Sequence, residues 1–508
     1  MEQAPAQPQR PSDTYWLTRF VMLRWLGFVY FFAYLTAVRQ LVPLVGTNGL
    51  TPASLFFDQI REHVGSSWAG FELLPSIFWI NCSDAWLQTV PWIGLILSCV
   101  LLAGYANAPM LAVLWVLYLS IVHAGQDWYG YGWEIQMLET GFLSIFLCPL
   151  LDARPFPLRP PPLTVIFLFR WLIVRIMLGS ALIKLRGDSC WRDFTALYTF
   201  FETQPIPNPI SRLFHFLPHP LLQFGVGMTY LVELIAPWFV FWPRWGRYMA
   251  GALMIGFQLT LIISGNFSFF NWLTILPALA CFDDRAWERI LPVRLVAWAN
   301  QARQQSRPST AMIVTGWAVT AVIVLLSIQP VLNLLSANQM MNTSFDRLHL
   351  VNTYGAFGSV GKERAVLVFE GTESANPDTA TDWKEYHCVA LPDDLNRAPI
   401  QIAPYQPHLD WQLWFAAMGR PDDYPWTLNL VWKLLHNDPA TLGLMGPNPF
   451  PDHPPRYIRC VLYIYHFAQP GNPEHVYWTR DRLGLWLPAL STDNADFTAF
   501  LRAQKWIP

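Results

Sequence analysis

The sequence has few charged residues. Only 13% of its 508 residues are Asp, Glu, Lys or Arg, whereas soluble domains carry about 25%. The formal net charge is -2, so the chain has no basic excess with which to bind nucleic acid. It is instead 53% hydrophobic and contains 26 Trp. Because Trp and Tyr collect where a membrane meets water, this composition predicts a membrane protein.

A cleavable leader and the common catalytic motifs are also missing. The first residues, MEQAPAQPQRPSD, are polar and lack an apolar core. We therefore expect residues 1–14 to form a disordered cytoplasmic tail, and the first apolar helix to act as an uncleaved insertion signal. The sequence has no Gly-rich phosphate loop, GxSxG or HExxH motif, and no Cys/His set with zinc spacing. We expect neither a metal nor a cofactor.

Long apolar runs dominate the first two-thirds of the chain. A helix needs roughly 20 apolar residues to cross a bilayer, and several runs reach or approach this length. We predict a polytopic α-helical membrane bundle of about eight or nine spans over residues 15–335. The runs are 20–38, 86–104, 108–124, 135–151, 163–185, 221–242, 248–265, 267–282 and 311–335.

Arginine is unevenly distributed over the loops between these runs. The short loops 124–134 and 265–267 contain no Arg or Lys, whereas the alternate loops are rich in Arg. Because cytoplasmic loops carry the excess of positive charge, we place the N-terminus in the cytoplasm. The long loops 39–85 and 186–220, and everything after residue 335, are then outside it. The inside arginines are Arg154, Arg159, Arg244, Arg247, Arg285, Arg289, Arg294, Arg303 and Arg307.

Residues 336–508 have a different composition. Charged residues return, and short β-branched and aromatic stretches alternate with turn residues. The stretches 365–372, 385–391 and 456–467 are typical of strands, and 408–418 and 425–437 are typical of helices. We predict a β-sandwich-like extracytoplasmic domain with helical insertions.

Several charged residues fall within or beside the apolar runs, where a charge is costly. One interpretation is internal Arg–Glu pairing that fixes the order of the helices, and the other is a polar cavity between them. Lys184 ends its run, so its ammonium group can also reach the membrane surface by snorkelling. The charged residues are Arg24, Glu134, Glu139, Arg170, Arg175, Lys184 and Glu233.

The segment 184–220 is rich in Pro and aromatic residues. It is either an interfacial segment that offers a surface to another protein's apolar patch, or a lid on the helix bundle. We take Trp191 from this segment, with Trp411, Trp414 and Phe415 further on, as candidates for contact with a client protein. Each of these residue types is more often part of a core.

Four of the seven cysteines fall in segments that we place outside the bilayer: Cys82, Cys190, Cys388 and Cys460. A disulfide among them is one alternative, but the sequence does not assign a pair. No CxxC motif is present, which argues against a thiol-exchange factor.

Long stretches along nearly the whole chain resemble lipase maturation factors. The sequence shows no extended polar tail and no ER-retrieval signal. It therefore resembles a compact member of the family, and a bacterial source is one alternative. The stretches are YWLTRFVMLRWLGFVYFFAYL (15–35), KLRGDSCWRDFTALYTFFETQPIPNPIS (184–211), NWLTILPALACFDD (271–284), VNTYGAFGSVGKER (351–364), FEGT (369–372), DWKEYHC (382–388), APYQPHLDWQLWFAAM (403–418) and PPRYIRCVLYIYHF (454–467).

This resemblance implies a non-enzymatic, chaperone-like maturation factor. Its partners would be the lipid bilayer and immature secreted clients, namely lipases, and its C-terminal domain would handle the client. The resemblance implies the ER membrane in a eukaryote; in a bacterium the site would be the inner or plasma membrane.

A second, weaker resemblance suggests an enzyme. Lys184-Leu185 followed by Trp191 is similar to the KL…DW stretch of the vitamin K-dependent carboxylase and its bacterial transmembrane relatives, although RGDSC alters the spacing. This resemblance implies Lys184 as a base that acts on a lipid or quinone-like substrate.

Overall fold

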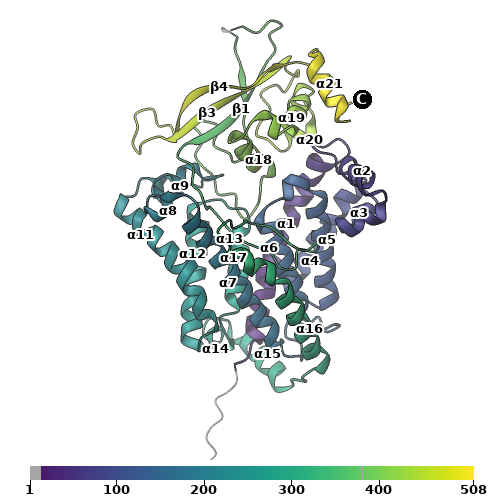
Figure 1. The fold of residues 1–508 in the computed structure, drawn as a ribbon, viewed down its shortest axis with the longest axis vertical. Coiled ribbons are helices and arrows are strands. Elements are labelled where there is room, and N and C mark those ends of the chain that lie inside the picture. The colour runs from purple at the N-terminus through teal and green to yellow at the C-terminus, as the bar shows by residue number, and fades with distance from the viewer. Residues whose placement is uncertain (1–12, 379–380) are drawn as a thin grey trace, which may run out of the picture.

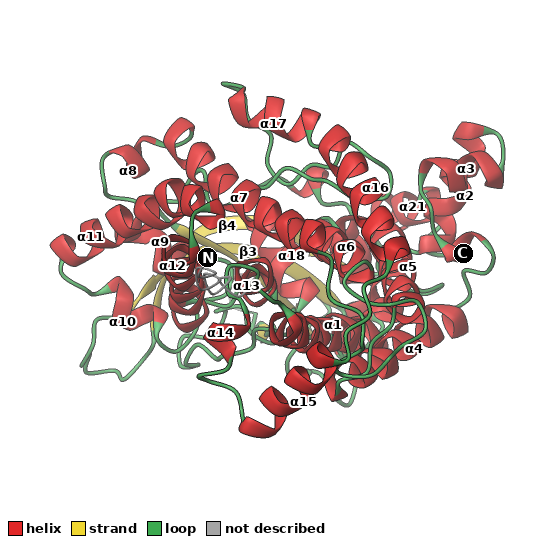
Figure 2. Cartoon of the chain, turned by 90° about the horizontal axis from the view of Figure 1, so that it is seen from below, coloured by secondary structure: helices red, strands yellow, loops and turns green. Residues whose placement is uncertain are grey.

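The computed structural model describes residues 13–378 and 381–508. The helices of the first two-thirds stand side by side, and a small sheet with its own helices sits on one end of them (Figure 1). We call this the sheet end of the bundle and the opposite end, where α14 (Asp284–Trp287) and α15 (Val293–Gln304) lie, the far end. Viewed from the far end, the strands lie behind the bundle helices (Figure 2).

Six helical segments in the described part of the chain are long and apolar enough to cross a membrane. The helical membrane bundle is confirmed, but the count of eight or nine spans is not. The runs at 108–124, 135–151 and 267–282 form the shorter helices α5 (Ala108–Ala124), α6 (Gly132–Ile145) and α13 (Phe270–Leu279). The six segments are α1 (Trp16–Val45), α4 (Asp84–Ala103), α7 (Leu163–Arg186), His219–Phe241, α12 (Arg244–Ser264) and Thr310–Leu335.

Two of these segments are not regular α-helices throughout. Thr310–Leu335 consists of α16 (Thr310–Leu326) and α17 (Ile328–Leu335). His219–Phe241 begins as α11 (His219–Tyr230), continues as the π-helix η3 (Leu231–Ile235) and ends as the 3-10 helix η4 (Ala236–Phe241). Pro237 lacks an N–H and so disturbs the helical hydrogen bonds before it. The π-turn carries Glu233, one of the predicted buried charges.

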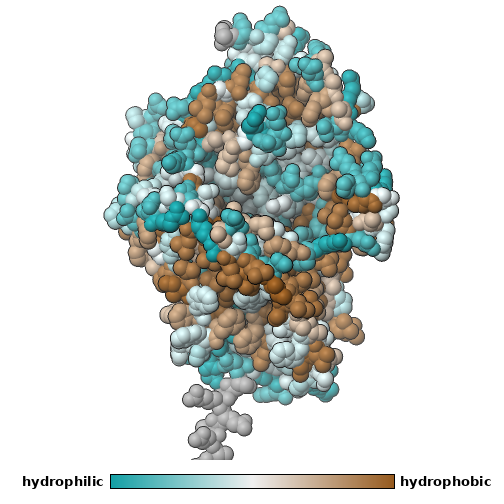
Figure 3. Space-filling view, viewed as in Figure 1, coloured by the Kyte–Doolittle hydropathy of each residue, from teal (hydrophilic) through white to brown (hydrophobic). Residues whose placement is uncertain are grey.

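An apolar belt crosses the face of the bundle that Figure 3 shows, between its two hydrophilic ends. Large side chains such as Trp317, Val324 and Leu325 are more than half exposed there. A soluble protein rarely exposes a continuous apolar surface of this extent, whereas lipid tails cover it without cost. The belt therefore supports an integral membrane protein.

Short helices connect the long ones and close the sheet end. They include the hairpin of α2 (Ala53–Val64) and α3 (Ser67–Leu73), and three helices in the Pro-rich segment after α7. The bounds of the others are η1 (Ile77–Trp79), η2 (Gln126–Tyr129), α8 (Ser189–Arg192), α9 (Leu197–Thr203) and α10 (Ser211–His215).

The C-terminal region contains one antiparallel sheet of four strands, in the order β2-β1-β3-β4. The helices α18 (His408–Ala417) and α19 (Trp426–Leu435) pack against β1 and β3 respectively. Within the described residues no second sheet is present, so the prediction of a β-sandwich is wrong. The other elements are β1 (Arg364–Thr372), β2 (Lys384–Tyr386), η5 (Pro421–Asp423), α20 (Pro439–Leu442), β3 (Tyr457–Phe467), β4 (Trp478–Leu490) and α21 (Ala495–Ala503).

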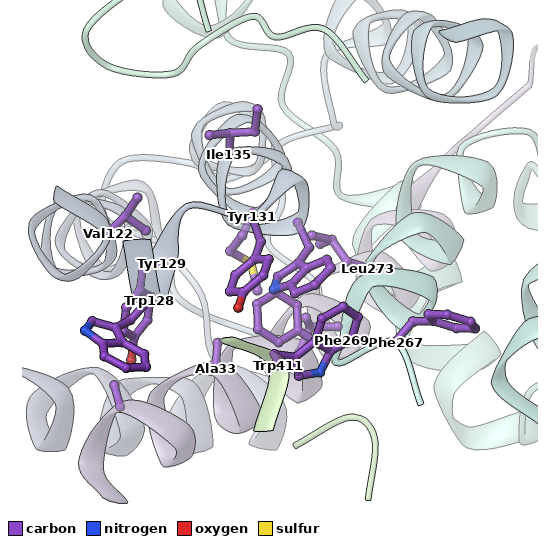
Figure 4. Packing of buried hydrophobic residues seen from close by; sticks show 14 of the residues in the cluster. Ala33, Val122, Trp128, Tyr129, Tyr131, Ile135, Phe267, Phe269, Leu273 and Trp411 are labelled. Atoms are coloured by element: carbon purple, nitrogen blue, oxygen red, sulfur yellow. The ribbon is translucent and has the colours of Figure 1, made fainter. Parts of the chain in front are cut away.

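One hydrophobic core runs from the bundle into the C-terminal region. Trp128 of η2 packs edge-on against Trp426 of α19, with ring centroids 4.9 Å apart. Tyr131 contacts Trp411 of α18 in the same manner at 5.8 Å, and Figure 4 shows both side chains in one cluster, coming from different segments. The two parts therefore share their packing, and the sheet is not suspended from a flexible linker.

Candidate functional site

A cavity of about 410 Å³ lies where the bundle meets the C-terminal region. We call it the junction cavity. The surface is recessed there, between the apolar belt and the C-terminal region (Figure 3). Its walls combine segments far apart in the sequence: 130–133, Phe200, 203–205, Phe267, Phe270, 341–342, 355–361, Glu363, Ala365, Trp411, Trp414, Phe415 and Met418.

Three of the four predicted client-contact residues line this cavity. Trp411, Trp414 and Phe415 lie on one face of α18, because positions three and four apart align on a helix. Trp411 is buried, with only 4% of its surface exposed, whereas Trp414 and Phe415 are half-buried. The rings of Trp414 and Phe415 meet at 4.8 Å. The helix thus presents an aromatic face to the cavity.

The fourth candidate, Trp191, is not at the surface. It is only 2% exposed, and its Nε1 donates a hydrogen bond to the carbonyl oxygen of Phe357 at 2.7 Å. Direct contact between Trp191 and a client is therefore excluded in this conformation. Trp191 supports the segment that forms the cavity wall.

Much of the Pro-rich segment around Trp191 is also buried. Residues 200–208 are covered throughout. Arg364 of β1 donates to the carbonyl oxygens of Glu202 at 3.0 Å and Pro205 at 2.8 Å. Burial lowers the pKa of Arg364 to about 9. The lid interpretation is thus correct for residues 200–208.

Behind the junction cavity is a smaller chamber of about 50 Å³ that contains Lys184 and Glu233. Phe200, Phe267 and Phe357 line both spaces, and their rings contact one another at 5.0–6.1 Å. The ammonium of Lys184 donates to both carboxylate oxygens of Glu233, at 2.7 and 2.8 Å. Lys184 therefore does not snorkel, because it is held inside the bundle.

Glu139 and Arg175 form a buried ion pair between α6 and α7. The predicted Arg–Glu pairing is correct here, but further partners come from the C-terminal side. Asn352 N and the Tyr354 hydroxyl donate to Glu139 at 3.1 and 2.7 Å. Arg175 donates to the carbonyl oxygen of Asn352 at 2.8 Å. The pair thus holds the chain that leads into the cavity wall.

The other three predicted charges do not form ion pairs in the described structure, so the pairing interpretation is wrong for them. Arg170 donates to the carbonyl oxygen of Ala280 and to the Tyr15 hydroxyl. Glu134 accepts a hydrogen bond from Tyr118. Arg24 donates to the carbonyl oxygen of Phe20 and lies over its ring.

A second buried ionic cluster lies at the far end, and sequence reasoning missed it. Asp283 accepts hydrogen bonds from Arg244 and Arg247, which we had assigned only to an arginine-rich loop. Asp284 accepts from the first N–H groups of α1, those of Trp16 and Leu17, at 3.1 and 2.8 Å. The run of two aspartates after α13 was the available signal.

All seven cysteines are free thiols, so no disulfide joins Cys82, Cys190, Cys388 or Cys460. Within residues 13–378 and 381–508, no cluster of three or more His, Cys, Asp or Glu side chains could hold a metal ion. The walls of the junction cavity instead carry aromatic rings and hydrogen-bonding groups.

Comparison with known proteins identifies the family. Residues 17–289 match the lipase maturation factor transmembrane domain, and residues 350–488 match the lipase maturation factor C-terminal domain. The chain is 43% identical to lipase maturation factor 1 of Bos taurus, over 97% of this chain and 92% of the relative.

Other relatives extend the match. Lipase maturation factor 1 of Homo sapiens is 42% identical over 97% of this chain and 91% of its own. Lipase maturation factor 2 of Xenopus laevis is 27% identical over 94% and 83%. No solved structure matches. The resemblance drawn from the motifs is confirmed, and the carboxylase-like alternative is not favoured. The chain belongs to the lipase maturation factor family.

Proposed function

We propose that this protein is a membrane-bound maturation factor that assists the folding and assembly of secreted proteins, with lipases as clients. The observation that carries the proposal is its 43% identity, over nearly the full length of both chains, to a protein named for lipase maturation. Both the transmembrane and the C-terminal domains of the family are matched. The proposed function is therefore inferred from relatives that match along both domains, not from a match to a single segment.

The proposed orientation has the far end in the cytoplasm and the sheet end in the ER lumen or, in a bacterium, outside the cell membrane. Support comes from the arginine-rich segments, since α14 and α15 carry Arg285, Arg294 and Arg303 and lie at the far end (Figure 1). The first described residue, Asp13, pairs with Arg244 at the same end. Because cytoplasmic segments carry the excess of positive charge, these arginines favour a cytoplasmic location for the far end.

The proposed mechanism is non-covalent. An immature secreted subunit exposes apolar surface that it will later bury, and such surface promotes aggregation. The aromatic face of α18 lies at the junction cavity, just above the apolar belt, where a chain that enters the secretory space can reach it. Transient contact there would shield the client until it assembles. Lys184 has no part in this mechanism beyond its structural ion pair with Glu233.

Co-expression with a secreted lipase tests the proposal. In cells that lack their own lipase maturation factor, we expect this protein to raise the secreted lipase activity, with the total lipase protein measured in parallel. A secreted reporter that needs no maturation factor is the control. Correct membrane expression without any gain in lipase activity would contradict the proposed function.

A further inference from the structure

We propose that the junction cavity binds an extended, apolar stretch of client main chain, with a large apolar side chain packed on Trp414 and Phe415. The client's identity rests on the proposed function. The chemical class of the ligand, a peptide, is inferred from the groups that line the cavity.

The first observation is a row of unused main-chain donors. Residues 355–361 form a wall of the cavity and belong to no helix or strand. Gly355 N donates to Asn342, but the N–H groups of Ala356, Phe357 and Gly358 have no acceptor in the described chain. Ala356 and Phe357 are half-buried and Gly358 is buried, and main-chain N–H groups are usually paired, either with the chain or with water. This wall is therefore suited to a ligand that brings carbonyl oxygens.

Two side chains on the cavity walls are also incompletely bonded. The Nε1 of Trp411 is buried without an acceptor, and the Oε1 of Gln204, a residue only 2% exposed, is buried without a donor. A buried indole N–H usually finds a partner. Both atoms are covered by neighbouring groups, so the unpaired main-chain N–H groups at 356–358 are the donors that favour a peptide. A peptide group supplies carbonyl oxygens to such donors, whereas an acyl chain supplies none.

The apolar part of the cavity suits a bulky side chain. Its volume of about 410 Å³ is within the range of about 300–1,000 Å³ for specific ligand sites. Trp and Tyr are the residues that most often dominate protein recognition, and Tyr131, Trp133 and Trp414 all line the cavity. Unpaired main-chain donors beside aromatic rings match recognition of an extended peptide, in which the main chain gives affinity and pockets select side chains.

Peptide binding to the full-length protein tests the inference. The protein is placed in lipid nanodiscs, because free detergent can occupy an apolar cavity. The probe is a dye-labelled octapeptide in which Phe alternates with Thr, followed by fluorescence anisotropy. We expect saturable binding to the wild-type protein.

Three variants locate the site. Ser359 is exposed and lines the cavity, so Ser359→Trp obstructs it without removing a core contact and should weaken binding by about tenfold or more. Trp414→Ala removes a half-buried ring from the cavity wall and should weaken binding by about three- to tenfold. The matched control is Trp298→Ala, which removes a tryptophan that is 54% exposed on α15 at the far end. It should bind like the wild type.

The contrary results are equally specific. Equal peptide affinity of the wild type and Ser359→Trp would overturn the inference. So would binding of labelled oleate, sensitive to Ser359→Trp, with no binding of the peptide, because the site would then hold lipid. Lipase rescue without peptide binding would refute this inference alone, whereas peptide binding without lipase rescue would refute only the proposed function.

Discussion

Both ends of the helix bundle bury ion pairs between bundle residues, but the pair at the sheet end also has hydrogen-bond partners from the C-terminal side. At the far end, Asp283 is bonded by Arg244 and Arg247, which all belong to the bundle. At the sheet end, Glu139 pairs with Arg175 and also accepts a hydrogen bond from Asn352, 213 residues away in sequence.

This difference assigns the two clusters different structural roles. The far-end cluster connects helices of the bundle to one another: Arg244 and Arg247 of α12 bond Asp283, and the adjacent Asp284 caps α1. The sheet-end cluster joins the bundle to the segment that becomes the wall of the junction cavity. A buried ion pair also needs hydrogen bonds to its remaining lone pairs, so the donors of Asn352 and Tyr354 make docking of this segment part of what stabilises the pair.

The largest effect is expected from Arg175→Met. It leaves Glu139 buried without its cation, and breaking a buried pair costs about 3–5 kcal/mol. We expect a much lower thermal unfolding midpoint and faster proteolysis within residues 339–361. The matched control on the same helix is Arg170→Met, which breaks hydrogen bonds but no ion pair and should cost about 1–3 kcal/mol. The pair would not join the bundle to this segment if both variants had the same thermal midpoint and residues 339–361 stayed resistant to proteolysis.

Arg364→Met should have the next largest effect. Three carbonyl oxygens, those of Glu202, Gln204 and Pro205, lose their donor, at a cost of about 2–3 kcal/mol. Because this arginine joins β1 to the buried loop, hydrogen exchange should increase at residues 200–208. Unchanged protection of that loop would show that Arg364 does not hold it.

At the far end, Asp284→Ala removes the cap from the first turn of α1 and should cost about 1–2 kcal/mol. The thermal midpoint should fall modestly, while proteolysis within residues 339–361 stays at the wild-type rate. Faster cleavage of that segment would mean that the two ends are coupled and that the comparison between them fails.

A pH-dependent effect of opposite sign is expected from Asp410→Asn in α18. Burial raises the pKa of Asp410 to about 7 from its ordinary 3.8. The folded state therefore retains a proton that the unfolded chain has released, and this group's contribution to stability is lost as pH rises from about 4 to 7. The variant should gain stability relative to the wild type across that window, by an amount on the order of 4 kcal/mol.

Only the difference between variant and wild type isolates this effect. Burial lowers the pKa of His408 to about 3, so that group makes the protein more stable as pH rises over much of the same range. Thermal midpoints of both proteins at several pH values provide the measurement. A difference that is constant with pH would contradict the buried, protonated carboxyl.

The smallest effect is expected from a reductant. Since all seven cysteines are free thiols, the thermal midpoint should be the same with and without dithiothreitol. A lower midpoint in the reduced sample would reveal a disulfide.

Sequence reasoning predicted what local pattern and hydropathy determine. The long apolar helices, the strand at 456–467 and the helices α18 and α19 follow directly from residue type and period. The strand β4 was missed because it contains Arg480, Asp481 and Pro488, which are typical of an exposed edge. The span count was not confirmed, because residues 108–124, 135–151 and 267–282 are apolar but form short helices.

The junction cavity was predictable only in part. The aromatic residues of α18 were selected by residue type in a stretch typical of a helix, and their common face was found only in the structure. The sequence could not reveal the unpaired N–H groups at 356–358, nor the hydrogen bonds that Asn352 and Tyr354 donate to Glu139. Their role depends on which distant segments meet in space, and no local pattern encodes that meeting.

Hydrogen exchange in two matched variants tests the central claim most directly. Arg175→Met breaks the sheet-end pair, and Arg247→Met breaks the far-end cluster. The account predicts that only Arg175→Met accelerates exchange in residues 352–355, where three main-chain N–H groups are hydrogen-bonded, and that only Arg247→Met accelerates it in residues 281–284. Equal acceleration of both segments by either variant would contradict the separate roles of the two ends.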